Sequence, residues 1–111
     1  MIHIIRSHAT PEQLEEMLAA FEITIKVVVD IQRGILAGGG RAHSDCEEAL
    51  LKDGSQQRDL WGANWLPVPR DVQFESLINI RPGQNNYGMT ISDPLLRRQV
   101  EEVVRQLLEG V

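Results

Sequence analysis

The chain has 111 residues, of which 42% are apolar and 24% charged, with a formal net charge of −5 and a sequence pI near 5.1. This is the composition of a globular protein, and it excludes a disordered chain, whose hydrophobicity would be lower. The basic residues are scattered along the sequence, which argues against nucleic acid as a partner. Apolar runs fall far short of the roughly 20 residues that span a bilayer. We therefore expect one α+β domain over residues 1–111, with no membrane partner.

The cysteine content and the first residues bear on the cellular compartment. Cys46 is the only cysteine, so an intramolecular disulfide is excluded. The chain opens on a strand-like run, Met1 to Arg6, instead of the basic and apolar segments of a signal peptide. Both observations favour a reducing, cytoplasmic setting.

Two amphipathic helices are predicted, one near each end of the chain. Thr10, Pro11 and Gln13 supply an N-cap, a first-turn proline and a capping-box partner, and apolar residues follow at helical spacing to Phe21. Asp93 and Pro94 repeat the cap-then-proline start. The apolar face of that second helix consists of Leu96, Val100, Val103, Val104, Leu107 and Leu108.

The segment between the helices is rich in strand and turn signals. Ile23–Ile31 and Ile35–Ala37 read as a hairpin, followed by three glycines at 38–40. The segment 41–52 is ambiguous: Ser44 and Glu47 match a capping box for a short helix, whereas Asp53-Gly54 matches a hairpin turn. We choose a strand. A strand carrying Leu60 and Trp61, a loop over 67–71, and two strands over 74–81 and 87–92 complete the prediction.

The predicted architecture is thus an antiparallel meander with both helices packed on one face, in the order β-α-β-β-β-β-β-β-α. Terminal helices around a run of strands are incompatible with a doubly wound parallel sheet, which needs alternating crossovers. The second face of the sheet is then left to solvent or to another copy of the chain. We therefore expect homo-oligomerisation as one way of covering it.

Reactive side chains are densest over residues 43–48. On a strand, His43, Asp45 and Glu47 share one face, where an imidazole with two carboxylates would bind a divalent metal or act as an oriented base. With a two-residue Asp53-Gly54 loop, the register also sets Glu48 opposite Asp59. The alternative interpretation is a charged, solvated edge. Cys46 is best interpreted as a buried, inert thiol.

A second group of candidates lies around Gly62. Trp61, Asn64 and Trp65 would stack on a flat ligand, although tryptophans in a small protein more often belong to its core. Arg81 would meet an anion or a partner's carboxylate from the polar side of its strand. The glycines at 38–40 lack the Lys-Ser/Thr ending of a phosphate loop.

Much of the sequence resembles a family of small uncharacterised bacterial proteins common in cyanobacteria. The segments that carry the resemblance are Gly34–Gly39, His43–Glu48, Asp53–Ser55, Asp59–Gly62 and Ser76–Pro82. The resemblance implies a bacterial cytoplasmic origin, but no reaction, cofactor or catalytic residue.

Two functions from different classes fit these observations. The first is a non-enzymatic module that binds itself, another protein or a small ligand, with no cofactor. The second is a metal-assisted or acid–base hydrolase that uses His43, Asp45 and Glu47, with Asp59 as a further candidate. The second requires these side chains to converge in space.

Overall fold

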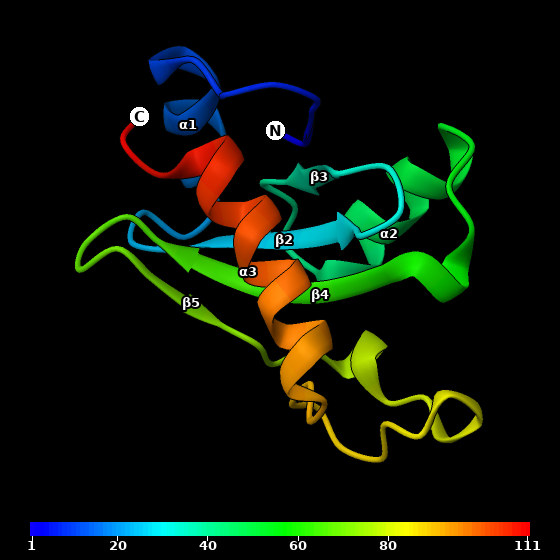
Figure 1. Cartoon of the computed structure of the whole chain (residues 1–111). Helices are drawn as coiled ribbons and strands as arrows, with labels where there is room; N and C mark the ends of the chain where they lie inside the picture. The colour runs from blue at the N-terminus through cyan, green and yellow to red at the C-terminus, as the bar shows by residue number, and fades with distance from the viewer.

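A computed structural model describes all 111 residues of the chain, which folds as an α+β protein (Figure 1). Short 3-10 turns, η1 to η3, occupy Gln57–Asp59, Leu77–Asn79 and Pro82–Gln84. The regular elements in chain order are β1 His3–Ile5, α1 Pro11–Leu18, β2 Ile25–Asp30, β3 Ile35–Gly38, α2 His43–Lys52, β4 Leu60–Leu66, β5 Asp71–Gln73 and α3 Pro94–Leu108.

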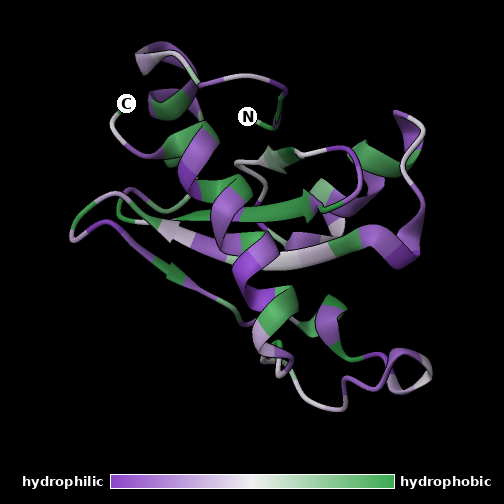
Figure 2. Ribbon diagram, in the orientation of Figure 1, coloured by the Kyte–Doolittle hydropathy of each residue, from purple (hydrophilic) through white to green (hydrophobic).

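The five strands form one antiparallel sheet in the order β1-β3-β2-β4-β5. β2 is the central strand, where Val28 pairs with Ala37 of β3 and with Gly62 of β4. Figure 2 shows β2 as a hydrophobic ribbon, consistent with its burial on both faces. The predicted class, an antiparallel sheet with a helix near each end of the chain, is confirmed.

One face of the sheet carries the larger core. Alternate residues of β2 and β4, among them Val27, Val29 and Trp65, join the apolar stripes of α1 and α3 in a single buried cluster. In Figure 1, α3 crosses this face of the sheet while α2 lies behind the other. The two capped helices therefore share one face, as predicted from their apolar stripes.

The predicted strand over residues 41–52 is wrong, because most of this segment is the helix α2. Asp53-Gly54 ends that helix instead of turning a hairpin: Gly54 has φ +104°, and Ser55 N–H donates to the Leu50 carbonyl at 3.0 Å. Cys46 and Leu50, one turn apart, are fully buried with Val28 in the second core cluster. The second sheet face is thus covered by the chain's own helix, and not left for solvent or a partner.

The two predicted strands over 74–81 and 87–92 are also wrong. After β4, only β5 joins the sheet, and the segment 74–92, which we call the arm, holds two 3-10 turns and isolated bridges. Its polar side chains bind the edge of β4 directly. The Asn79 amide accepts from Gly62 N–H at 2.8 Å and donates to the Gly62 carbonyl at 3.0 Å, while Arg81 donates to the Leu60 carbonyl. These two side chains replace the hydrogen bonds that a neighbouring strand would make.

No helix of the protein combines the length and the apolar character needed to cross a membrane.

Candidate functional site

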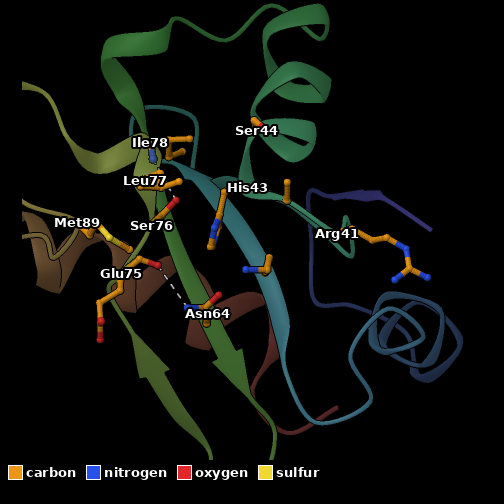
Figure 3. A pocket seen from close by; sticks show the side chains of 11 residues that line it. Arg41, His43, Ser44, Asn64, Glu75, Ser76, Leu77, Ile78 and Met89 are labelled. Carbon is orange, nitrogen blue, oxygen red and sulfur yellow. Dashed lines mark hydrogen bonds between the residues drawn. The ribbon is translucent and has the colours of Figure 1, made fainter.

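A cleft of about 510 Å³ opens at the N-terminal end of α2. Its lining comes from five parts of the chain: β2, the loop before α2, the first turn of α2, β4 and the arm (Figure 3). Its volume lies within the range of about 300–1,000 Å³ that is typical of small-molecule sites. Because the cleft joins segments far apart in the sequence, it is the candidate functional site.

His43, the first residue of α2, lies at the centre of the cleft and is only 8% exposed. Its Nε2 lies 2.8 Å from the Ala63 carbonyl oxygen, which can only accept, so Nε2 carries the proton. Burial lowers the pKa of His43, and the Lys26 ammonium lowers it further, against the opposing hydrogen bonds to Ala63 and Asn64. The ring is therefore neutral near pH 7, and with the proton on Nε2 its Nδ1 is an acceptor.

Lys26 supplies the positive charge of the cleft. It lies in the central strand β2, between Ile25 and Val27, and is half-buried. No carboxylate forms a salt bridge with it, and its Nζ lies 5.3 Å from the centroid of the Phe21 ring. The positive charge of Lys26 is thus available to a ligand in the cleft.

Asn64 lies directly opposite Lys26 in the register of β2 and β4. Its side-chain Nδ2 donates to the Glu75 carbonyl at 3.4 Å, the dashed contact in Figure 3. In the same view the Glu75 carboxylate points away from His43, and the Arg41 side chain extends away from it on the other side. The floor of the cleft therefore presents one ammonium, one amide and one neutral imidazole.

The first turn of α2 adds backbone donors to this floor. The N-cap residue, Ala42, has no side chain that could accept a hydrogen bond. The N–H groups of His43 and Ser44 begin the helix and have no intrahelical acceptor. The positive end of the helix dipole therefore adds to the charge of Lys26.

The predicted catalytic and metal-binding residues do not converge. On a helix with 3.6 residues per turn, His43 and Glu47 share a face but Asp45 turns away and is exposed. Glu47 faces Arg81, with 3.8 Å between the carboxylate and guanidinium atoms. Asp59 lies in η1, at the other end of β4 from the cleft. No group of three His, Cys, Asp or Glu side chains is arranged to hold a metal ion.

Of the predicted ligand-binding residues, only Asn64 lines the cleft. Trp61 and Trp65 are 3% and 1% exposed within the larger core. Arg81 lies over the Trp61 ring, 4.5 Å from its centroid. Its guanidinium donates to the backbone carbonyls of Gln57, Leu60 and Ile78. These three side chains therefore stabilise the fold and do not line the cleft.

Lys26 and the arm residues of the cleft wall were not among the site residues predicted from the sequence. Lys26 carried a usable signal, because it is the only charged residue in the run Ile25–Val29. A lysine in a central, buried strand is unusual unless its ammonium reaches water or a ligand. The wall residues carried no such signal, since their position depends on how the arm folds over Gly62.

Comparison with known proteins gives a family without an assigned activity. A family model described as "Protein of unknown function (DUF5674)" matches residues 3–107. This confirms the expected resemblance to an uncharacterised family, while the bacterial origin stays a prediction. No solved structure matches the chain.

Proposed function

The chain belongs to this family of unknown function, and we propose that it is a binding module for a small organic anion held in the cleft beside His43. The observation that carries the proposal is Lys26, which forms no salt bridge and lines the cleft together with His43 and Ser44 at the uncapped start of α2. Helix N-termini and unpaired cations both favour negative ligands. The rest of the cleft supplies polar groups that would orient such a ligand.

The attraction is local. The chain carries a net charge of −5, so an anion is repelled at long range and held only by groups in the cleft. The charge of Lys26 is felt there, since it adds to the effect of burial in lowering the pKa of His43. Glu75, the acidic residue of the cleft lining, turns its carboxylate outward.

A binding role is favoured over covalent catalysis by the state of the nearest nucleophile. Cys46 is fully buried, and burial raises the pKa of its thiol, which keeps it protonated and unreactive. The Ser76 hydroxyl is also buried and accepts a hydrogen bond from Ile78 N–H at 3.3 Å. Neither side chain is therefore available to attack a bound substrate.

An NMR titration with acetate and, separately, inorganic phosphate tests the proposal. We expect saturable shifts of the backbone amides of Lys26, His43 and Ser44, with dissociation constants in the millimolar range. Lys26→Met should weaken binding by about tenfold or more, because a hydrogen bond to a charged group contributes about 1.5–3 kcal/mol.

The matched control is Lys52→Met, which removes the only other lysine. Lys52 pairs with Glu48 at 2.9 Å on the exposed side of α2, away from the cleft. This variant should bind both anions as the wild type does. Shifts that do not saturate, or an equal loss in the two variants, would contradict the proposal.

The alternative function, an acid–base hydrolase, is supported by one observation: the neutral His43 ring, whose Nδ1 carries no proton. Such an enzyme would use Nδ1 as a general base toward water or substrate. Hydrolysis of p-nitrophenyl acetate, compared between wild type, His43→Gln and free imidazole, measures it. A wild-type rate no higher than that of the variant excludes this role.

Self-association also stays a prediction, although α2 covers the sheet face on which that prediction was based. Its support is the arm, where Leu77 and Tyr87 are both 71% exposed. Large exposed apolar side chains of this kind are common at interfaces. Size-exclusion chromatography with light scattering decides the matter, and a strict monomer at high concentration would remove the prediction.

A further inference from the structure

The cleft has two chemically distinct halves. Lys26, His43 and Asn64 form a polar floor, while Leu77, Ile78 and Met89 of the arm form an apolar wall (Figure 3). From this division we infer that the ligand is a monocarboxylate with an apolar chain, its carboxylate on Lys26 and its chain along the arm. This inference rests on the proposed function and adds the class of ligand.

The apolar wall is unusual because its large side chains are left in water. Leu77 is 71% and Met89 45% exposed, although both belong to segments fixed by hydrogen bonds. Ser76 N–H donates to the Met89 carbonyl at 3.1 Å, so the two side chains are held on neighbouring backbone segments. A ligand chain laid against them would remove apolar surface from water on both sides.

The polar floor fits a single negative charge. Two cations line the cleft, but the Arg41 side chain extends away from His43, and Lys26 is the one whose charge acts on the His43 ring. A phosphate monoester, with nearly two negative charges, is normally bound by a bidentate arginine or by several cations. A carboxylate needs only the ammonium and one or two N–H donors, which Lys26 and the first turn of α2 provide.

His43 adds a second element of recognition. Its Nδ1 is an acceptor, so it repels a further anionic oxygen and favours a ligand O–H or N–H beside the carboxylate. The wall alone would accept any apolar molecule, and the floor alone any small anion. Together they select one charge at one end and an uncharged chain at the other.

Isothermal titration calorimetry with a series of probes tests this assignment: acetate, butanoate, octanoate and octylamine. Full burial of one methylene of the ligand would raise its affinity about fourfold. Because the wall covers the chain on one side only, each methylene should contribute about half of that free energy, which raises the affinity about twofold. Octanoate should therefore bind more than tenfold tighter than butanoate. Octylamine, with the same chain and the opposite charge, should not bind measurably.

Two leucine-to-serine variants test whether the apolar wall causes the gain in affinity with chain length. Leu77→Ser should reduce octanoate affinity several-fold and leave acetate affinity unchanged. Leu95→Ser removes a leucine of similar exposure, 67%, from α3 on the opposite face, and should change neither. Circular dichroism verifies that both variants are folded.

The possible results separate this inference from the proposed function. Equal binding of octanoate and butanoate would overturn the inference while acetate binding upheld the anion site. Octylamine binding as tightly as octanoate would overturn both, because charge would then play no part. A peptide with a C-terminal leucine that binds tenfold tighter than octanoate would also overturn the inference, since the carboxylate would then belong to a protein partner.

Discussion

Gly62 lies where β4 meets the arm, and replacing it with any residue that has a side chain should destabilise the protein. A Cβ atom on Gly62 would lie 2.6 Å from the Cβ and 2.7 Å from the Oγ of Ser76, which is 2% exposed. Overpacking costs about 1–3 kcal/mol. Any shift of the backbone also weakens the two hydrogen bonds to Asn79, each contributing about 1 kcal/mol. Alanine recovers about 0.4–1 kcal/mol from the unfolded chain. Gly62→Ala should therefore lower the free energy of unfolding by roughly 2–3 kcal/mol.

Urea denaturation of Gly62→Ala measures this loss, with Gly83→Ala as its control. Gly83 has no atom within 4 Å of the position of an added Cβ, so its replacement should not destabilise the protein and should raise the free energy of unfolding by at most about 1 kcal/mol. For a protein of this size, 1 kcal/mol corresponds to roughly 4 °C in Tm. A Tm for Gly62→Ala within 2 °C or so of the control would refute the close approach of β4 and the arm.

Three further predictions follow from the hydrogen bonds and pKa shifts. The pKa of His43 is lowered from 6.5, so its stabilising effect is complete above that pH and is lost as pH falls toward the folded-state value. His43→Gln should flatten the decline in denaturation midpoint below pH 6.5. Arg6 and Arg33 lower the pKa of Asp53 from 3.8 to about 2, so that stabilisation is lost as pH falls between these values. Asp53→Asn should remove this part of the acid titration of stability. Arg81→Ala, which leaves the carbonyls of Gln57, Leu60 and Ile78 without this donor, should lower the free energy of unfolding by about 2–3 kcal/mol in urea.

The helix starts could be predicted because their signals are local. The capping box is present as expected: Gln13 N–H donates to Thr10 Oγ1 at 3.1 Å, and Thr10 N–H donates to Gln13 Oε1 at 2.9 Å. Asp93 accepts from Leu95 N–H at 2.9 Å at the start of α3. Each depends on residues within one helical turn, so sequence alone specifies it.

The dipeptide Asp53-Gly54 is a local signal that does not determine the structure around it. A hairpin turn and a helix C-terminus both place a glycine at positive φ, so the dipeptide fits either structure. The choice depends on packing across the sheet, where Cys46 and Leu50 fill the surface above Val28 only if they lie on a helix. His43, Asp45 and Glu47 were grouped on one face because a strand was predicted, and in a strand every second side chain points to the same side.

The candidate site was similarly hidden by long-range pairing. Lys26 and Asn64 are far apart in the sequence and meet only because β2 and β4 pair in this register. Asn64 was singled out for its neighbouring tryptophans, whereas its relevance comes from the strand opposite. Arg81 was predicted to lie on the polar side of a strand, but this segment is not a strand, and Asn79, two residues earlier, is fully buried and binds Gly62.

The arm links the stability of this protein to its proposed binding role. Asn79 and Arg81 satisfy backbone groups of β4 that a partner chain could otherwise pair with, which protects an exposed sheet edge. The same contacts fix Ser76 over Gly62 and set Leu77 and Met89 as the wall of the cleft. A change that loosens the arm from β4 should therefore weaken ligand binding and folding together, whereas Lys26→Met should affect binding alone.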